Sequence, residues 1–476
     1  MLDRRVIRDL EQQVDVPHVY TRPADLAAYA YDAWGASGER HVPDAVVFPA
    51  STEEVADVVK VCAHHSVPLV ARGAGTGYAA GAAPFDGGVV LSLARMHRIL
   101  GLEPDALRVH AEAGAITRSI HLAAAAAGLY YPPDPGSSTT CTIGGNVACN
   151  AAGPHTLRYG VTADYVPGVT AVLADGRIVR LGEGGDRSLD RLLAIITGSE
   201  GTLAIITEVL LRLLPAPAAR ATLGATFSSM QSAAEAVSAI AAAGIVPAAL
   251  EFLDAGAIRA VQRAGGGDVG RDAAALLLVE VEGDVAAVSS EREAVRDAVA
   301  RSAAAVDEAG DATQAARLWA VRKAVSAAVA KVMIGKVNED VVVPRDRVAE
   351  LVDQTVTMGA RHELPVVNFG HLGDGNVHAT FLMDPRIPGD RERAEAAAGD
   401  LFETVLAMGG SLSGEHGVGQ AKIPYVEQQL GSAGVELMRR LKHELDPQGL
   451  LNPGKKVPPA ARAGALQAEP LVAAVR

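Results

Sequence analysis

The feature that most restricts the fold of this chain is a glycine-rich loop, RGAGTG (72–77), directly after a short apolar segment. A glycine loop after a strand is typical of Rossmann folds, but that motif needs G-x-G-x-x-G opening a helix. Tyr78 stands here in the place of the third glycine, and YAAGAAPFDGG (78–88) has too much glycine and proline for a helix. No G-K-[ST] follows, so the loop is neither a Rossmann fingerprint nor a P-loop.

Two uses of this loop stay open on the residues alone. Its backbone N–H groups could surround a phosphate, with the glycines allowing close approach and Thr76 adding a hydroxyl. Alternatively, it is a tight surface turn. A second stretch, 130–154, favours a ligand-binding role, because irregular segments this long inside a compact domain are usually functional. Its many hydroxyl and amide groups and its low charge suit a large polar aromatic ligand.

The length of the chain indicates more than one domain. Its 476 residues exceed the roughly 250–300 that one hydrophobic core supports. PAPAAR (215–220) interrupts the strand pattern, so we place the main boundary there, and the following alternation of Ala-rich helices with strands predicts an α+β domain with an antiparallel sheet. The predicted units are an N-terminal helical segment (1–40), a cofactor domain (41–217), a substrate domain (218–457) and a disordered Ala/Pro-rich tail (458–476).

Two local patterns make specific predictions. STEEVADVVKVCAHH (51–65) is predicted to be a helix in which Ser51 and Glu54 form a capping box. LLAIITGSEGTLAIITEVLLRLL (192–214) is the longest apolar segment, but it contains charged residues, so we expect two buried strands around a turn rather than a membrane span.

Charge and cysteine content narrow the class of protein further. The net charge of −13 is spread along the chain, which argues against a nucleic-acid surface. Three cysteines without C-x-x-C spacing suit a reducing compartment and provide no iron–sulfur motif. No uncharged apolar run reaches the roughly 18 residues of a transmembrane helix. We therefore predict a cytoplasmic protein, either free or peripheral to the inner membrane.

The two loops together resemble the FAD-binding domain of the vanillyl-alcohol oxidase and p-cresol methylhydroxylase (PCMH) superfamily, in its branch of glycolate oxidase subunit GlcD and D-lactate dehydrogenase. The likeness runs from about His41 to Lys456. It implies an α+β fold, with a two-subdomain PCMH-type FAD-binding domain followed by an α+β cap domain that binds substrate. Because the first loop has no histidine for covalent attachment, we expect non-covalent FAD. The resemblance implies cofactor contacts at Arg72, Gly73, Ala74, Gly75, Thr76, Gly77, Asp134, Thr142, Gly145, Asn146, Gly198, Glu200, Gly201, Ile206 and Asn452.

Histidines and a carboxylate gather in the second half of the sequence. HLGDGNVH places His371 and His378 at either end of a turn between strand-like segments, and Glu415 and His416 follow between glycines. A lone histidine is more often a hydrogen-bonded structural residue, but two imidazoles and a carboxylate form a set suited to Zn, Mn or Fe(II). The resemblance implies His371, His378 and Glu415 as ligands of a divalent metal and His416 as the catalytic base.

The same resemblance implies how a substrate is held. Arg322 occupies the position at which relatives bind the substrate carboxylate, although a solvated helix charge is the alternative. Lys336 is a second candidate anchor, and His371 is a further candidate contact to the substrate. In the expected reaction, His416 takes the hydroxyl proton while a hydride leaves Cα for the flavin N5, and the metal lowers the pKa of the alcohol.

These expectations predict an FAD-linked dehydrogenase that oxidises a small D-2-hydroxy acid, D-lactate or a near relative, to the 2-oxo acid. The alternatives are a GlcD-type glycolate oxidase subunit and a flavoprotein electron-transfer subunit of a larger complex. Without an iron–sulfur motif, the chain needs an external electron acceptor: a quinone, a cytochrome, an electron-transfer flavoprotein or partner subunits. A homodimer is compatible with the sequence.

Overall fold

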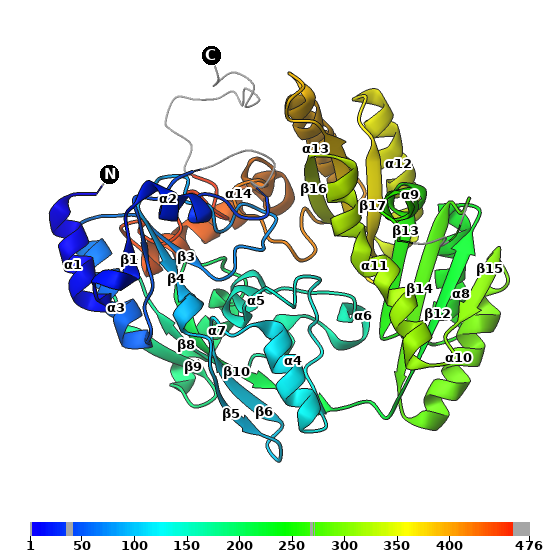
Figure 1. Ribbon diagram of the computed structural model, residues 1–476, viewed down its shortest axis with the longest axis horizontal. Coiled ribbons are helices and arrows are strands. Elements are labelled where there is room, and N and C mark those ends of the chain that lie inside the picture. The colour runs from blue at the N-terminus through cyan, green and yellow to red at the C-terminus, as the bar shows by residue number, and fades with distance from the viewer. Residues whose placement is uncertain (1, 35–40, 267–269, 271, 460–476) are drawn as a thin grey trace.

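A computed structural model describes residues 2–34, 41–266, 270 and 272–459 of the chain. Three sheets lie in the first half and one large sheet lies in the second, and the two halves sit side by side (Figure 1). The last helical segment, α14 (Ile423–Leu445), which is kinked at Gly431, returns to the first half, where Leu69 bridges to Leu451. The fold is mixed helix and sheet, as the sequence predicts.

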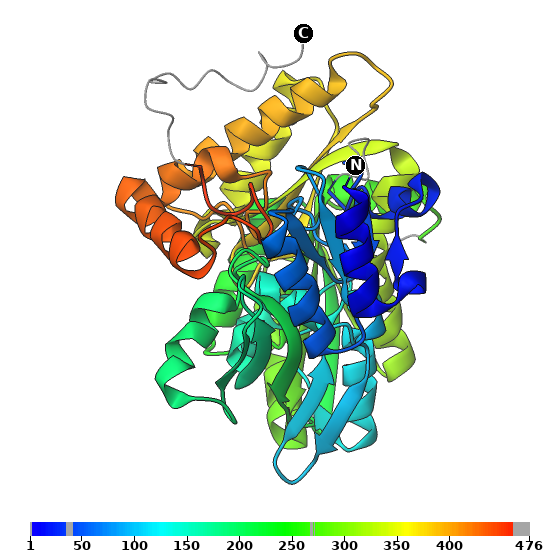
Figure 2. The ribbon, with the colours of Figure 1, turned by 90° about the vertical axis from the view of Figure 1, so that its left-hand side faces the viewer.

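The first sheet has four strands in the order β1-β2-β4-β3, and only the β1–β2 pair is antiparallel. Its strands are β1 (Val19–Tyr20), β2 (Ala45–Val47), β3 (Leu69–Arg72) and β4 (Val89–Ser92), and its helices are α1 (Arg4–Val14), α2 (Pro23–Leu26) and α3 (Thr52–His64). Helices α1 and α3 pack together on the outside of this sheet (Figure 2, blue).

The start of α3 differs slightly from the predicted capping box. The Ser51 hydroxyl accepts the Glu54 N–H at 3.2 Å, as predicted. The Glu54 carboxylate, however, accepts the N–H of Ala50 at 2.8 Å rather than that of Ser51.

The second sheet is antiparallel, in the order β5-β6-β10-β8-β9. Its strands are β5 (Ile99–Glu103), β6 (Arg108–Glu112), β8 (Gly168–Val172), β9 (Ile178–Gly182) and β10 (Ile205–Arg212). The prediction of two strands in 192–214 is wrong in its first half, which lies in helix α7 (Asp190–Ile196). β10 already pairs with β6 and β8 on both sides, so no edge is left for another strand beside it, and periodicity alone does not separate short apolar helices from strands.

The 130–154 stretch is less irregular than its sequence indicates. It follows α4 (Thr117–Ala126), begins at β7 (Leu129–Tyr130), which pairs with β11 (Leu214–Pro215), and contains α5 (Ile143–Cys149). Helix α6 (Thr156–Tyr159) follows it. α5 packs closely against the end of β6, where the Gly144 N–H donates to the Ala113 carbonyl at 2.8 Å. This close approach needs glycine, which is why Gly144 stands in α5 although glycine lowers helix propensity.

The large sheet has seven strands, all antiparallel, in the order β15-β12-β14-β13-β17-β18-β16. These strands are β12 (Ala219–Phe227), β13 (Ala249–Asp254), β14 (Ala275–Gly283), β15 (Ala305–Glu308), β16 (Gly335–Val342), β17 (Val366–His371) and β18 (Asn376–Met383). One face packs into a core with α8 (Met230–Ala242), α10 (Val285–Val299), α12 (Val348–Arg361) and α13 (Asp390–Ala407). The other packs in part against α9 (Ala255–Arg263) and α11 (Ala312–Val332).

Part of this second face is polar and meets the first half of the chain. Glu280 of β14 accepts the Trp319 indole N–H at 2.7 Å and lies 3.7 Å from the His155 ring. Arg220 pairs with Glu280 at 3.3 Å, and its guanidinium lies over the Tyr130 ring. Paired charges and aromatic rings therefore form one part of the contact between the two halves. None of the helices in the described part of the chain has the length and apolarity that crossing a bilayer requires.

The packing of α5 gives a testable prediction. A Cβ at Gly144 would lie 2.5 Å from the Ala113 Cβ and 2.9 Å from its carbonyl oxygen. Gly144→Ala is therefore expected to lower the free energy of unfolding by about 1–3 kcal/mol, measured by urea denaturation. Gly136→Ala, whose Cβ meets nothing within 4 Å, is the control. Equal stability of the two variants would contradict the close packing.

Candidate active site

Strand register brings the two predicted histidines together. β17 and β18 pair so that His371 is opposite Asn376 and Phe369 is opposite His378. Because side chains alternate along a strand, His371 and His378 lie on the same face as diagonal neighbours. Their ring centroids are 5.3 Å apart and the rings are nearly perpendicular, at 85°. The turn predicted from HLGDGNVH thus places both imidazoles in one site.

Glu415 completes a set of donors that could hold a metal. The Nε2 atoms of His371 and His378 each lie 3.4 Å from the Glu415 Oε1. Two ligand atoms that each lie about 2.1 Å from a tetrahedral metal are about 3.4 Å apart, so this spacing suits a shared ion. The three side chains are at most 12% exposed. Two nitrogens and one oxygen also match the donors that Zn, Mn and Fe(II) accept.

A buried aspartate, Asp340 of β16, holds the loop that carries Glu415 and His416. Its Oδ2 accepts the N–H groups of Gly414, Glu415 and His416, each at 2.8 Å, and the Ser413 hydroxyl at 3.1 Å. Burial alone would raise the pKa of Asp340, but the His416 ring and backbone N–H help to hold it well below its usual range. Asp340 is therefore ionised, and it anchors the loop.

The charge state of the cluster follows from burial and mutual attraction. Burial opposes ionisation of Glu415, yet the neighbouring histidines, His371 foremost, lower its pKa to about 2. Burial lowers the pKa of His378 to about 3, so this ring is neutral. Burial also opposes a charge on His371, but Glu251 and Glu415 raise its pKa well above the usual value. A metal at this site would have to displace the His371 Nε2 proton.

Glu251 of β13 joins the histidine cluster to Arg322. One carboxylate oxygen is 2.5 Å from the His371 Nδ1 and the other accepts the Arg322 Nε–H at 2.7 Å. Arg322 extends from α11, and its guanidinium lies over the Phe369 ring at 4.9 Å. Sequence reasoning did not single out Glu251, which is fully buried. The available signal was a lone carboxylate inside the otherwise apolar segment AALEFL (248–253).

His416 lies between the two halves of the protein. Its ring stacks on the His378 ring with centroids 5.2 Å apart, and the Tyr78 ring lies tilted against it with centroids 5.1 Å apart. Burial lowers the pKa of His416, so the neutral ring can accept a proton. Its Nδ1 has no hydrogen-bond partner among the described residues. The Lys336 ammonium lies 5.1 Å from the Tyr78 ring, and burial lowers its pKa.

Tyr78 is a second residue that sequence reasoning did not recognise as part of the site. In the sequence it only marks a break in a glycine motif. In the fold, Tyr78 directly follows the glycine loop, and its ring contacts the His416 ring. It therefore links the glycine loop to the histidine cluster.

The segments predicted to contact FAD converge at the end of β3. A Cβ at Gly73 would lie 2.2 Å from the Thr142 Oγ1, so the glycine loop touches the start of α5. That hydroxyl is buried and has no hydrogen-bond partner within the described chain. Gly75 adopts a positive φ of 68°, which favours glycine. A glycine cradle beside an unpaired hydroxyl fits a phosphate-bearing cofactor.

Other predicted cofactor residues use their side chains within the protein. Arg72 curls back over Gly75 and donates to the Ala82 carbonyl at 3.3 Å. The Asn146 amide donates to the Thr117 hydroxyl at 2.7 Å. The remaining predicted residues lie as follows: Ala74, Thr76 and Gly77 in the glycine loop, Gly145 in α5, Asp134 with its carbonyl against Gly153, Gly198 bonded to the end of α5, Gly201 beside Asn452, and Ile206 with its side chain in the core.

Glu200 and Asn452 connect segments that are distant in the sequence. The Asn452 amide donates to the carbonyls of Gly81 and Glu200, at 2.9 and 2.7 Å. The Glu200 carboxylate accepts N–H groups of Val418 and Gly419, beside His416. The C-terminal return of the chain thus ties the flavin segments to the histidine cluster.

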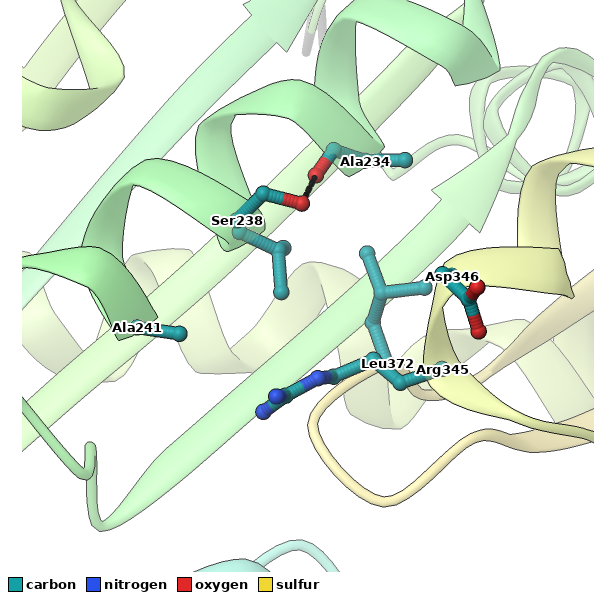
Figure 3. A pocket seen from close by; sticks show the side chains of 7 residues that line it. Ala234, Ser238, Ala241, Arg345, Asp346 and Leu372 are labelled. Atoms are coloured by element: carbon teal, nitrogen blue, oxygen red, sulfur yellow. Dashed lines mark hydrogen bonds between the residues drawn. The ribbon is translucent and has the colours of Figure 1, made fainter.

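A cavity of about 210 Å³ lies away from this cluster, beside α8 (Figure 3). Its lining consists of Ala234, Val237, Ser238, Ala241, Arg345, Asp346 and Leu372. Leu372 follows His371 directly, but α8 covers the opposite face of the sheet. The cavity contains none of the predicted site residues, so the chemistry of the donor set, not the cavity, locates the site.

Two family models match the chain, one in each half. The FAD binding domain matches residues 43–182, and the C-terminal domain of FAD linked oxidases matches residues 216–456. Fold, site and matches together define an FAD-linked oxidoreductase. The chain belongs to the family of FAD-linked oxidases that includes glycolate oxidase subunit GlcD and D-lactate dehydrogenase.

Several relatives align over most of their length. GlcD of Bacillus subtilis (strain 168) is 38% identical over 445 residues, covering 92% of this chain and 94% of the relative. GlcD of Escherichia coli (strain K12) is also 38% identical, covering 93% and 89%. D-lactate dehydrogenase of Anaerostipes hadrus is 34% identical, covering 87% and 89%.

Solved structures confirm the predicted fold. p-Cresol methylhydroxylase with substrate bound has a TM-score of 0.78 at 17% identity, covering 95% of this chain and 96% of that chain. 4-Ethylphenol oxidase from Gulosibacter chungangensis has a TM-score of 0.76 at 18% identity, covering 96% and 97%. The PCMH-type fold expected from the two loops is therefore the fold of this protein.

The role of Asp340 as an anchor gives a second prediction. Asp340→Asn replaces an acceptor of five hydrogen bonds with an amide that also donates, so the free energy of unfolding should fall by about 3 kcal/mol. Glu339→Gln, its neighbour on the other face, is the control. Burial raises the pKa of Glu339 to about 7, so a neutral side chain there should cost about 1 kcal/mol or less. Equal losses in denaturant titrations would refute the anchoring role.

Proposed function

We propose that the protein oxidises a small D-2-hydroxy acid, D-lactate or a close analogue, to the 2-oxo acid. The observation that carries this proposal is the convergence of His371, His378, Glu415, His416 and the Glu251-linked Arg322 in one buried site. This set combines metal-type donors, a neutral imidazole and a cation, which are the groups that a hydroxy acid requires.

In this proposal, His371, His378 and Glu415 bind a divalent metal, Zn, Mn or Fe. The 3.4 Å spacing of their donor atoms and their burial support this assignment. The bound ion would lower the pKa of the substrate hydroxyl. Glu251 orients the His371 ring through the Nδ1 contact, in the way that carboxylates commonly support metal-bound histidines.

His416 is the proposed general base. Its ring is neutral because burial lowers its pKa, and Asp340 fixes its backbone. A neutral imidazole of restrained position can accept the hydroxyl proton of the substrate. Contacts with the Tyr78 and His378 rings restrain the His416 ring.

Arg322 is the proposed anchor for the substrate carboxylate. Glu251 accepts its Nε–H, and this bond orients the guanidinium. The terminal nitrogens are then suited to a planar carboxylate, for which arginine is the preferred partner. Lys336 and the metal ligand His371 would complete the contacts to substrate.

The FAD-binding role of the chain assigns the electrons to the cofactor. FAD, when bound, supplies the two-electron acceptor for the hydride that leaves the substrate Cα. We propose that the glycine loop and Thr142 hold it non-covalently, since that loop contains no histidine. The remaining contacts predicted above, from Asp134 to Asn452 with the exception of Glu200, belong to the same proposal.

A second candidate is a glycolate oxidase subunit. The 38% identity to two GlcD proteins favours glycolate as the acid and partner subunits as the electron acceptor. A quinone, a cytochrome or an electron-transfer flavoprotein would serve equally in a single-chain dehydrogenase. For the first candidate, we propose an enzyme that acts without partner subunits, in the cytoplasm or at a membrane surface. A homodimer is part of the same proposal.

Anaerobic flavin reduction tests the substrate. Purified protein mixed with D-lactate is expected to lose its oxidised-flavin absorbance faster than with L-lactate, glycolate or D-2-hydroxyglutarate. Chelation should slow reduction, and adding back Zn, Mn or Fe(II) one at a time should restore it for the native metal. Faster bleaching by glycolate would instead favour the GlcD candidate. Bleaching by none of the acids would refute the dehydrogenase assignment for the chain alone.

A substitution tests the base. His416→Gln is expected to lower the rate of flavin reduction about 10²- to 10⁴-fold while FAD content stays unchanged, because only the proton acceptor is lost. His362→Gln is the matched control, since its ring bonds to Asp400 at 2.7 Å, outside the site. A stopped-flow rate for His416→Gln equal to that of the control would remove His416 from the mechanism.

A further inference from the structure

The loop of Glu415 and His416 lies between two buried carboxylates from different halves of the chain. Asp340, in the large sheet, accepts the N–H groups of Gly414, Glu415 and His416. Glu200, in the flavin-binding half, accepts N–H groups that lie just beyond His416. The first carboxylate accounts for the position of the loop within its own half. The second carboxylate, Glu200, bonds the same loop to the flavin-binding half.

The Glu200 side chain is fully engaged with this loop. Its Oε1 accepts the Val418 N–H at 2.9 Å and its Oε2 accepts the Gly419 N–H at 2.6 Å. The Lys456 ammonium donates to Oε1 at 3.1 Å. A Cβ at Gly417 would lie 2.7 Å from that same oxygen, so the backbone passes close enough to require glycine there. Glu200 is only 6% exposed.

The Glu200 backbone is held just as firmly by flavin-binding segments. Its N–H donates to the Ala148 carbonyl, in α5, at 2.7 Å. Its own carbonyl accepts the Asn452 amide at 2.7 Å. Its φ of 56° lies in the left-handed region, which residues other than glycine rarely adopt and which surrounding contacts must maintain. Because hydrogen bonds hold both its side chain and its backbone, Glu200 has a fixed position between the two halves.

A neighbouring contact reinforces the same connection. The Ala79 carbonyl, one residue after Tyr78, accepts the Gln420 N–H at 3.0 Å. The flavin-binding half therefore binds the backbone N–H groups of residues 418–420 through the Glu200 side chain and the Ala79 carbonyl. His416 itself contacts the Tyr78 ring of the same half.

We propose that Glu200 is a positioning residue, through which the flavin-binding half sets the place of the His416 loop relative to the cofactor. The idea rests on the proposed function, in which His416 acts on a substrate held against the flavin. It differs from the expectation that Glu200 is a cofactor contact. A cofactor contact would contribute to FAD affinity, whereas a positioning residue contributes to the rate of flavin reduction.

Kinetic and binding measurements separate these roles. Glu200→Gln places an amide N–H₂ against one backbone donor, and Glu200→Ala removes both acceptors. Both variants should bind FAD within about threefold of the wild-type affinity in fluorescence titrations and show a similar dependence on D-lactate concentration. Their limiting rate of flavin reduction should fall about 10- to 100-fold, since an error of about 1 Å in placing a reacting group has effects of this size.

The control for these variants is Glu208→Gln. Glu208 is a half-buried carboxylate of β10 that bonds to His110 and Thr170, away from the loop. Its variant should keep both the affinity and the rate. If Glu200→Ala does not fold, Glu200→Gln, which conserves size, provides the same comparison.

Hydrogen exchange gives a readout that needs no substrate. Single-amide exchange in Glu200→Gln should rise at Val418 and Gly419 but stay slow at Gly414, Glu415 and His416, which Asp340 holds. This pattern would support the proposal even if no hydroxy acid reduces the flavin, a result that would refute only the proposed function. A tenfold loss of FAD affinity with unchanged exchange at Val418 and Gly419 would overturn the positioning role. So would an equal change in exchange rate at all residues from Gly414 to Gly419.

Discussion

The capture of one loop by the buried Asp340 carboxylate is the interaction on which the site depends. A charge without solvent is costly unless hydrogen bonds satisfy it, and here four donors from residues 413–416 do so. The same four bonds also satisfy the donors of the loop. Glu415 and His416 therefore receive fixed positions from a residue that needs no contact with substrate.

The face of the large sheet shows how such charges are tolerated. Side-chain alternation places Glu251, His371, His378 and Asp340 on one side of four neighbouring strands. Each carboxylate is matched by a histidine, an arginine or backbone N–H groups, so none is buried alone. Glu251 is central, because it touches both His371 and Arg322 and couples the metal-type donors to the cation. Packing of the other face against four helices makes this side rigid.

Local patterns predicted much of the fold but not its exceptions. The antiparallel second half and the helix after Ser51 follow from periodicity and capping, which act over a few residues. The helix at 190–196 was missed because its alternative, a strand, is excluded only by the pairing of β10 on both sides. Helix α5 was missed because its glycines are unfavourable locally, and the need for Gly144 is explained only by its contact with Ala113.

By itself, the sequence determined the kinds of chemistry available: a glycine loop that is not a Rossmann motif, two histidines on a turn, and Glu415 beside His416. The family matches confirm the flavoprotein class that these motifs predicted. Tertiary structure alone decided which groups meet. Asp340, Glu251, Tyr78 and Glu200 contact the motif residues from positions far along the chain, and a single carboxylate or tyrosine carries no local signal of its partner. Strand register and the packing of the two halves supply that information, because they set distances that spacing in the sequence does not.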